Sequence, residues 1–254
     1  VAVRVEVRRS GSWATPTTVR TDTAGRFRAS LAYGRGQLTT HTVRVSYPAA
    51  NRNRREVSGS ASVRRVKVLN AVVRGTTAAD VAKTFRRGCP VGPSKLRTIS
   101  LNYYGYDGRM HRGVVIMRSS LTQEVIRGFG KALAAGYPIS SMRNPNVWGG
   151  NDPKQMAANN TSGFNCRKVV GNPYAQSPHS YGIALDVNTV QNPFRDRNGK
   201  WWPANGRRYI DRTPLRKGML SSRSTLTRQL KRDDFFWGGR WYPGRDYQHF
   251  QHTG

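Results

Sequence analysis

Apolar and charged residues alternate along residues 1–8: Val occupies the odd positions, and three of the four even positions carry charge. A period of two is typical of a strand with one buried face. Similar alternation recurs over residues 27–31, 41–47 and 61–68, with turn-forming Gly, Ser, Asp and Asn residues between these segments. Several short strands joined by such turns predict a small all-β sandwich, immunoglobulin-like in plan, over residues 1–70.

Beyond this region the pattern changes, and helical spacing appears beside strand-like runs. Ser120 and Gln123 have the types and spacing of a capping box, in which two side chains bond back to the first N–H groups of a helix. Apolar residues then recur at helical spacing until Gly136: Leu121, Val125, Phe129 and Leu133. This stripe predicts an amphipathic helix with one buried face.

Other elements are expected on both sides of this helix. Residues 77–80 resemble a second capping box, and residues 224–231 fit a short helix. Residues 98–104 and 113–117 flank an Asp-Gly pair, which indicates a hairpin or a loop between strands. Residues 183–187 form a short apolar strand. Because helices and strands alternate irregularly here, we predict an α+β domain over the rest of the chain, residues 71–254.

The chain is strongly basic, with 43 Lys and Arg residues against 13 Asp and Glu and a formal net charge of +30. This charge predicts a polyanionic neighbour such as nucleic acid, an anionic membrane or an acidic cell-wall polymer. The basic residues are scattered and no nucleic-acid-binding motif appears, so we expect no specific nucleic acid. No run approaches the ~20 apolar residues of a transmembrane helix.

Cys89 and Cys166 are the only two cysteines. They are too few and too far apart for a zinc-ribbon pattern, and two readings remain open. As a pair they would form one disulfide in an oxidising compartment, and otherwise they are two buried free thiols. The chain begins at Val1, with neither an initiator Met nor a signal peptide, which we interpret as typical of a processed or trimmed secreted protein.

Candidate chemistry begins with His179 and Asp186. Asp186 stands inside the apolar run 183–187, where a buried carboxylate is costly unless a cation compensates it. Gly182 lies between the two residues and allows a sharp bend that turns both side chains toward one point. Imidazole is a common metal ligand, so the pair indicates a metal site.

A second acid and histidine follow near the C-terminus. Asp246 and His249 are three positions apart in a strand-like segment, so a bulge or turn is needed to face both the same way. His252 competes with His249 as a ligand, and a salt-bridged surface pair of Asp246 with His249 is the alternative reading. Together the four residues supply three ligands and one base, as a catalytic zinc site with an open fourth position requires.

These segments together resemble a family of peptidoglycan metallopeptidases, which groups D-alanyl-D-alanine carboxypeptidases with the L-alanyl-D-glutamate peptidases of bacteria and phage. The resemblance covers about residues 80–252, and residues 1–70 lie outside it. The motifs that carry it are Ser177-Pro-His179-Ser-Tyr-Gly182-Ile-Ala184-Leu-Asp186-Val-Asn188, Asn192-Pro193, Trp237-Gly-Gly-Arg-Trp241 and Asp246-Tyr-Gln-His249-Phe250. The family core also resembles lysostaphin-type peptidases and the hedgehog fold, which implies a central antiparallel sheet.

The resemblance implies a role for each candidate residue. His179, Asp186 and His249 would bind Zn²⁺, and Asp246 would be the catalytic base. The segment Asn159-Asn160-Thr-Ser162-Gly-Phe-Asn165-Cys166-Arg167 matches the L-alanyl-D-glutamate branch. There Ser162 and Arg167 would contact substrate, Arg167 gripping either a carboxylate or the developing oxyanion, and Cys166 would pair with Cys89. Gln251 departs from the acid that many relatives carry after the motif.

Residues 144–172 are rich in Asn, Gly, Pro and Ser, and a loop this long is usually functional. We expect it to shape the pocket that decides which bond is cleaved. The Trp residues at 201, 202, 237 and 241 would line a groove or pack in the core.

The sequence thus predicts a monomeric zinc peptidase, secreted to the bacterial cell wall, with peptidoglycan and anionic wall polymers as partners. The alternative is a non-catalytic protein that binds wall polymer or another polyanion on a peptidase scaffold. Residues 1–70 would serve attachment, spacing or only stability.

Overall fold

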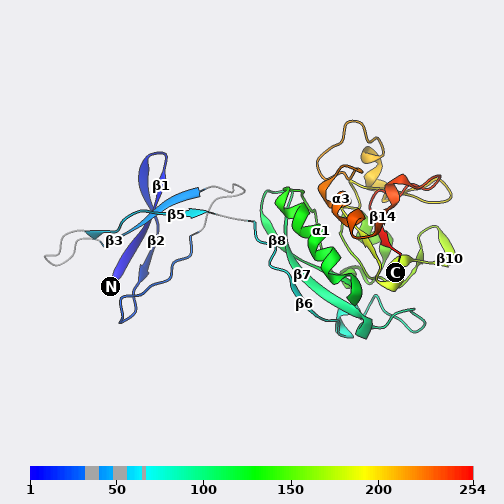
Figure 1. Cartoon of the computed structure of the whole chain (residues 1–254), viewed down its shortest axis with the longest axis horizontal. Helices are drawn as coiled ribbons and strands as arrows, with labels where there is room; N and C mark the ends of the chain where they lie inside the picture. The colour runs from blue at the N-terminus through cyan, green and yellow to red at the C-terminus, as the bar shows by residue number, and fades with distance from the viewer. Residues whose placement is uncertain (32–39, 48–55, 65–66, 254) are drawn as a thin grey trace. The chain divides into compact units, whose positions relative to one another are not determined.

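The computed structural model describes residues 1–31, 40–47, 56–64 and 67–253. The chain divides into two compact units, Val1–Lys67 and Val68–Gly254 (Figure 1).

The described residues of the N-terminal unit form one antiparallel sheet in the order β2-β1-β3-β4, with β5 paired to β3. Its strands are β1 (Ala2–Arg9), β2 (Ser12–Arg20), β3 (Thr40–Tyr47), β4 (Glu56–Val57) and β5 (Ala61–Arg64). The alternation of residues 1–8 is confirmed in part: Val3, Val5 and Val7 are buried and Arg4 and Arg8 are exposed, but Glu6 is buried too, where the β1–β2 register shifts between Val5 and Val7.

The predicted sandwich is not what the described residues form, because a sandwich needs two sheets. Residues 27–31, expected to be a strand, pair with no strand in the described part of the chain and have no regular structure. Periodicity records which side chains face one way, but a strand also needs a neighbour for its backbone hydrogen bonds. Part of the expected strand over residues 61–68 lies outside the described residues.

The C-terminal unit combines several small antiparallel sheets with three α-helices among its described residues. The first sheet has the order β6-β7-β8, with β6 (Val72–Gly75), β7 (Leu96–Tyr104) and β8 (Met110–Arg118). The expected hairpin is confirmed: β7 and β8 pair in register from Leu96↔Arg118 to Tyr104↔Met110. At its tip the Asp107 carboxylate accepts a hydrogen bond from the Arg109 N–H, and Gly108 has a φ of 75°.

Helix α1 (Thr122–Ala134) carries the predicted apolar stripe. All four stripe residues are buried, and Gly136, with a φ of 68°, ends the helix. The predicted capping box at Ser120 is wrong, because a 3-10 turn over Ser119–Leu121 precedes α1, and the helix has no side-chain cap. Helix α3 (Thr225–Arg232) packs against α1, and Leu230 comes so close to Gly128 that a side chain there would force Leu230 to shift.

The second sheet carries the site residues and has the order β11-β15-β14. Its strands are β11 (Ala184–Asp186), β14 (Phe235–Trp237) and β15 (His249–His252). The remaining elements are α2 (Asp152–Ala157), the pairs β9 (Lys168–Val169) with β10 (Asn172–Gln176) and β12 (Phe194–Arg195) with β13 (Trp201–Trp202), and 3-10 turns at Ala79–Val81, Pro93–Lys95, Pro145–Trp148, Pro178–Tyr181, Ala204–Tyr209 and Gly238–Arg240. The α+β mixture is confirmed, but two three-stranded sheets replace the expected single central one.

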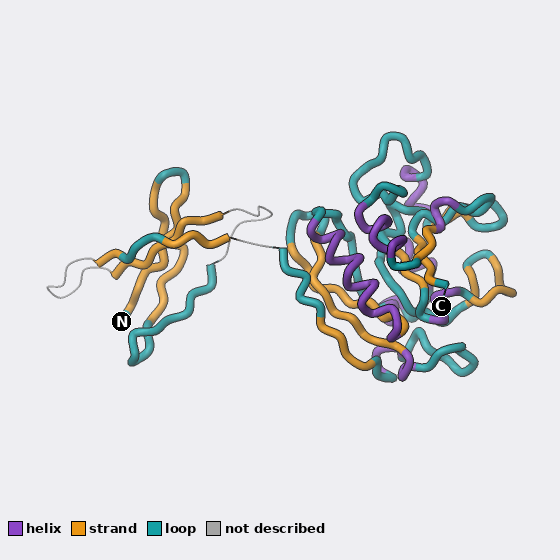
Figure 2. Tube along the Cα trace, in the orientation of Figure 1, coloured by secondary structure: helices purple, strands orange, loops and turns teal. Residues whose placement is uncertain are grey.

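One hydrophobic core joins both three-stranded sheets to α1 and α3. Its buried members include Ile99, Met117, Phe129, Leu185, Leu226 and Phe250. Figure 2 shows how much of this unit consists of loops around these elements. The core therefore fixes β11 and β15, from which the site residues project, while loops supply the rest of the site.

Cys89 and Cys166 form a disulfide with an S–S distance of 2.04 Å, as the resemblance implied. Cys166 is buried beside Phe164, Val81 and Leu96 in a second apolar cluster. The bridge therefore anchors the segment that leads into Arg167. Among the described residues no helix has the length and apolar character needed to cross a bilayer.

Candidate metal centre

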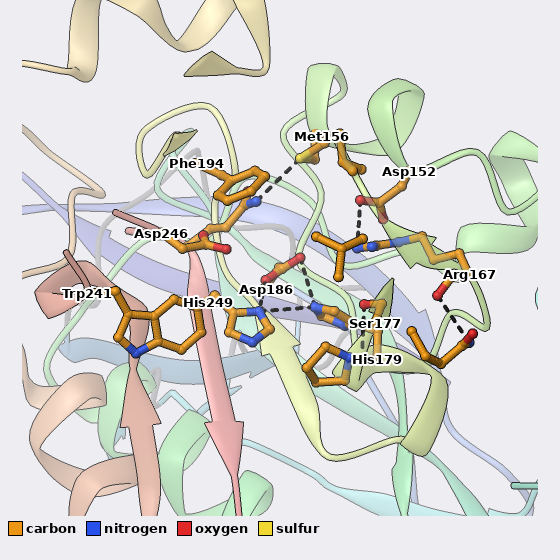
Figure 3. A pocket seen from close by; sticks show the side chains of 15 residues that line it. Asp152, Met156, Arg167, Ser177, His179, Asp186, Phe194, Trp241, Asp246 and His249 are labelled. Atoms are coloured by element: carbon orange, nitrogen blue, oxygen red, sulfur yellow. Dashed lines mark hydrogen bonds and ion pairs between the residues drawn. The ribbon is translucent and has the colours of Figure 1, made fainter. Parts of the chain in front are cut away.

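A pocket of about 320 Å³ opens where the second sheet meets the loops after α2 and β10 (Figure 3). Its lining is apolar with a few convergent polar groups, which is typical of ligand sites. The lining residues are Asp152, Met156, Arg167, Val169, Val170, Gln176, Ser177, Pro178, His179, Asp186, Phe194, Trp241, Asp246, Gln248 and His249.

His179 is presented by the 3-10 turn Pro178–Tyr181. The Ser177 side chain accepts a hydrogen bond from the His179 N–H, and Gly182 ends the turn with a φ of 68°. A side chain on Gly182 would collide with Leu96 and with the Arg118 backbone N. The left-handed conformation and the close packing both require glycine here, so the sequence prediction of a bend at Gly182 is confirmed.

Asp186 and His249 are direct cross-strand partners in the β11–β15 pair. Side chains opposite each other in an antiparallel pair stand on the same face, with Cβ atoms about 4.5–5.5 Å apart. A bend over Tyr247 and Gln248 precedes β15, and the His249 N–H reaches back to the Asp246 carbonyl at 3.4 Å. This bend is the turn that the spacing of Asp246 and His249 required.

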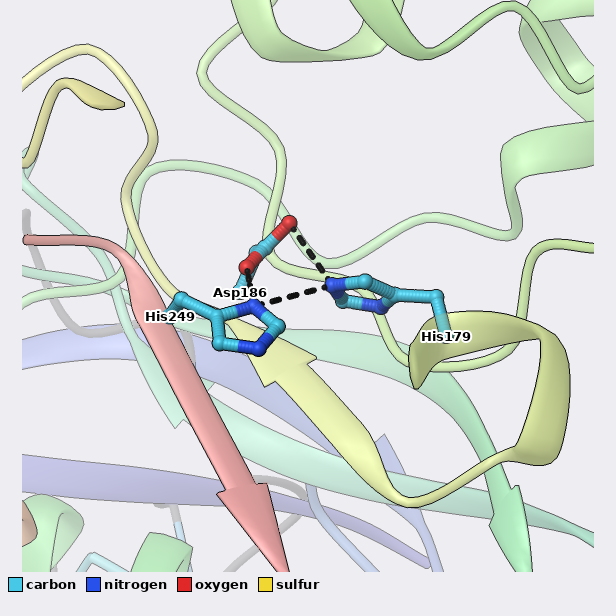
Figure 4. A group of neighbouring side chains, drawn as sticks. All are labelled: His179, Asp186 and His249. Atoms are coloured by element: carbon cyan, nitrogen blue, oxygen red, sulfur yellow. Dashed lines mark hydrogen bonds and ion pairs between the residues drawn. The ribbon is translucent and has the colours of Figure 1, made fainter. Parts of the chain in front are cut away.

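The three candidate ligands meet at one point (Figure 4). Nε2 of His179 lies 3.1 Å from Asp186 Oδ2, and Nδ1 of His249 lies 3.0 Å from Asp186 Oδ1. The two ring nitrogens are 3.2 Å apart, and the ligand atoms of all three residues lie within 4.8 Å of one another. All three side chains are buried.

The chemistry of this donor set fits a divalent cation. Nδ1 of His179 lies 2.6 Å from the Gly163 carbonyl oxygen, which only accepts, so Nδ1 carries a proton and Nε2 is the nitrogen that faces the other two ligands. Two imidazole nitrogens and a carboxylate are the ligand types that zinc takes in catalytic sites. Burial raises the pKa of Asp186, but the neighbouring His179 and His249 outweigh this effect and hold it below its usual range.

Asp246 completes the polar part of the pocket. Its side chain is buried, and its Oδ1 atom has no hydrogen-bond partner. Burial raises the pKa of Asp246 to about 7, and the Asp186 charge adds to this against the opposing effect of His249. A buried carboxyl with a bare oxygen and a pKa near neutrality is suited to exchange protons with a ligand in the pocket.

The two competing readings of the C-terminal histidines are resolved by position. His252 lies on β15 with its ring 5.3 Å from that of Phe235, outside the three-residue cluster. Asp246 and His249 are both buried, so the reading of a salt-bridged surface pair is wrong.

Arg167 lines the pocket but is already paired with an acid. Its Nη2 atom donates to Asp152 Oδ2 at 2.6 Å, and its Nη1 atom donates to the Lys168 carbonyl at 3.1 Å. Ser162 lies elsewhere: its backbone exchanges two hydrogen bonds with that of Asp186, and its side chain is not part of the pocket lining. Ser162 therefore holds the strand that carries Asp186.

The loop over residues 144–172 contributes Asp152, Met156 and Arg167 to the pocket, and it is partly ordered into α2. Among the four tryptophans, Trp241 lines the pocket with its ring 5.4 Å from that of His249. Trp237 instead packs in the core. Trp241 thus fits the prediction of a groove-lining residue, and Trp237 fits the prediction of a core residue.

Asp152 and Gln248 line the pocket and were missed in the sequence. Gln248 lies within the Asp246-to-His249 motif, so its place beside the site was a readable signal. Asp152 had a weaker signal, as an acid in the polar 144–172 loop of a chain with only 13 acidic residues. Its partner Arg167 lies 15 positions away, and no helical or strand periodicity links the two residues.

Comparison with known proteins gives one family match. A family model described as D-alanyl-D-alanine carboxypeptidase matches residues 170–252. No curated protein and no solved structure matches the chain. The match supports a peptidase of this kind. It includes His179, Asp186, Asp246 and His249, whereas Asp152 and Arg167 lie before it.

Proposed function

We propose that this chain is a secreted zinc peptidase that hydrolyses peptide bonds in the stem peptides of bacterial peptidoglycan. The observation that carries the proposal is the convergence of His179, Asp186 and His249 beside the bare carboxyl of Asp246. Support also comes from the family match over residues 170–252, which contains all four residues.

In this proposal His179, Asp186 and His249 hold the ion. Zinc held by these residues would act as a Lewis acid and would make a nearby water acidic enough to ionise at a pH of about 7. Asp246 accepts a proton from the attacking water and returns it to the leaving amine, as a general base and then a general acid. The Gly163 carbonyl keeps the His179 ring in the tautomer that ligates through Nε2.

Arg167 acts on the substrate from the same pocket. Its guanidinium donates hydrogen bonds to a substrate oxygen, either a carboxylate or the scissile carbonyl oxygen as charge develops on it. Val169, Val170, Phe194 and Trp241 contribute apolar surface to the pocket, which suits the small side chains of a stem peptide.

The basic charge supports a place at the cell wall. Residues 1–67 carry 14 Lys and Arg residues against three acidic residues, and the disulfide is compatible with an extracellular protein. We propose that this unit attaches the protein to anionic wall polymers, because such a charge raises the local concentration of protein on a polyanion. Pull-down with purified walls should weaken on deletion of residues 1–67, while hydrolysis of soluble stem peptides continues.

Digestion of purified peptidoglycan tests the function directly. Mass spectrometry of the released muropeptides should show new peptide termini, and a chelator should stop their formation until zinc is restored. The bond that is cut follows from the same spectra. Intact muropeptides after digestion with the zinc-loaded chain would refute the proposal.

A second candidate function rests on the net charge of +30. A non-catalytic protein on a peptidase scaffold would bind wall polymer or another polyanion with an affinity that falls steeply with salt. Chelator-sensitive cleavage would exclude this candidate, whereas salt-sensitive binding without cleavage would favour it.

A further inference from the structure

Asp152 is a buried acid in the pocket wall whose two oxygens are both committed to the protein. Oδ2 accepts from Arg167 Nη2 at 2.6 Å, and Oδ1 accepts from Gln155 Nε2 at 2.6 Å, with Asn165 Nδ2 at 3.5 Å. Its side chain is 3% exposed. An acid so completely bonded is poorly placed to bind substrate or carry protons, and its strongest contact is with Arg167.

The Arg167 guanidinium, by contrast, retains donors. Nη1 donates one N–H to the Lys168 carbonyl, and Nη2 donates one N–H to Asp152. Each of these two terminal nitrogens carries two N–H groups, so each keeps one further donor. The Nε atom is buried and has no partner. The fork is therefore held at two points while part of it remains available to the pocket (Figure 3).

The backbone of Arg167 is fixed as firmly as its side chain. Its N–H donates to Ser180 Oγ at 3.0 Å, and its carbonyl accepts from the Ser177 N–H at 3.0 Å. Ser177 and Ser180 belong to the turn that presents His179. The ion pair with Asp152 thus sets the guanidinium relative to the same turn that sets a candidate metal ligand.

We propose that Asp152 is a positioning residue for Arg167: it orients the guanidinium in the pocket wall and cancels its charge. This wall then offers the substrate an oriented hydrogen-bond donor in place of a free cation. A buried ion pair is neutral overall, so an entering free carboxylate gains little from it, whereas an uncharged peptide carbonyl is bonded without leaving an excess charge. The inference rests on the proposed function and favours the carbonyl role of Arg167 over the carboxylate role.

Acetate is the probe that separates positioning from a merely structural role. In protein labelled with ¹⁵N-arginine, the buried Nε–H signal of Arg167 is assigned by its loss in Arg167→Gln. In the parent, acetate should leave this signal unshifted. In Asp152→Asn the uncompensated guanidinium should bind acetate at least tenfold more tightly, with a saturable shift.

Two further variants control the experiment. Asp152→Asn/Arg167→Gln removes the cation and with it the Arg167 signal, so acetate binding to this variant, to Asp152→Asn and to the parent is also compared by calorimetry. The double variant should bind acetate no more tightly than the parent, which accounts for acetate bound at zinc. Asp233→Asn breaks another Asp–Arg pair, to Arg127, whose side chain is 47% exposed. Water already screens that pair, so Asp233→Asn should change neither acetate binding nor hydrolysis.

On peptidoglycan, Asp152→Asn should lower kcat at least tenfold with one zinc retained per chain, and acetate should inhibit it more strongly than the parent. An unchanged kcat, or acetate binding no tighter than in the parent, overturns the inference. If Asp152→Asn does not fold, the double variant should fold better, and equal instability of the two also overturns it. The acetate titration does not need activity, so a parent that fails to cut peptidoglycan refutes the proposed function alone.

Discussion

Within one pocket, Asp152 and Asp186 are both buried carboxylates, but they meet different partners. Asp152 lies against the permanent cation of Arg167 at 2.6 Å, whereas Asp186 lies at 3.0–3.1 Å from two imidazole nitrogens. We call Arg167 with Asp152 the arginine wall, and His179, Asp186, His249 and Asp246 the metal wall. The arginine wall contains its own cation, while the donors of the metal wall converge as lone pairs that suit a cation from outside.

The difference shows how buried acids are divided between structure and chemistry. In the arginine wall both oxygens of Asp152 accept hydrogen bonds, so this carboxylate orients the side chains around it. In the metal wall Asp246 keeps an oxygen without a partner, which is costly for the fold and useful only with a ligand present. Changes in the metal wall should therefore affect chemistry first, and changes in the arginine wall should affect stability and substrate orientation.

The largest effect is expected from removing a ligand of the metal wall. His249→Ala should lose zinc and reduce hydrolysis to background, because two remaining ligands do not make a zinc site of the catalytic type. His252→Ala is the matched control, since His252 lies outside the cluster, and it should keep both. Metal analysis after dialysis checks the stoichiometry, and full zinc occupancy in His249→Ala would contradict the assignment.

Next in size is the loss of the proposed base. Asp246→Asn should lower kcat by about 10²–10⁴-fold, the usual contribution of a positioned general acid–base group. Zinc content and the thermal midpoint should stay close to those of the parent, because the amide fills the same volume. Steady-state kinetics on muropeptides measure the change. Wild-type turnover would show that another group moves the proton.

Removal of the disulfide should affect the arginine wall and not the metal wall, because Cys166 directly precedes Arg167. Cys89→Ala/Cys166→Ala opens a loop with a sequence separation of 77, which should lower the free energy of unfolding by about 4 kcal/mol in the chain-entropy model. Denaturant unfolding followed by tryptophan fluorescence measures it. Zinc stoichiometry should be unchanged, and loss of zinc would mean that the bridge also holds the metal wall together.

The smallest effect is expected at Asp80, a more exposed counterpart of the arginine wall. Asp80 pairs with Arg74 at 2.6 Å, but the Arg74 side chain is 51% exposed. Asp80→Asn should therefore cost only about 0.2–1 kcal/mol of unfolding free energy at pH 7, the usual range for exposed pairs.

This contribution should depend on pH in a defined direction. The Arg74 hydrogen bonds hold the pKa of Asp80 below its ordinary value of 3.8, against the opposing effect of burial. A lowered folded-state pKa means that the stabilisation is complete above pH 3.8 and is lost as the pH falls toward the folded-state value. Unfolding of the parent and Asp80→Asn at several pH values checks this, and a difference that grows in acid would contradict it.

Local patterns in the sequence determined much of the scaffold. The stripe on α1, the β7–β8 hairpin and the bend at Gly182 depend on residues within a few positions of one another, so periodicity and turn chemistry suffice to predict them. The four residues of the metal wall were also predicted, because they lie in two short motifs that resemble a known family. The charge of +30 and the two cysteines needed no structure at all.

Tertiary structure decided what depends on distant partners. Alternation in residues 1–31 could not say how many sheets form, because strand pairing joins segments far apart in sequence. Register brought His249, and not His252, beside Asp186, since His249 is the residue opposite Asp186 on the neighbouring strand. The Asp152–Arg167 pair was unreadable for the same reason: local spacing gives the face on which a side chain lies, and only the packed chain gives its partner across the pocket.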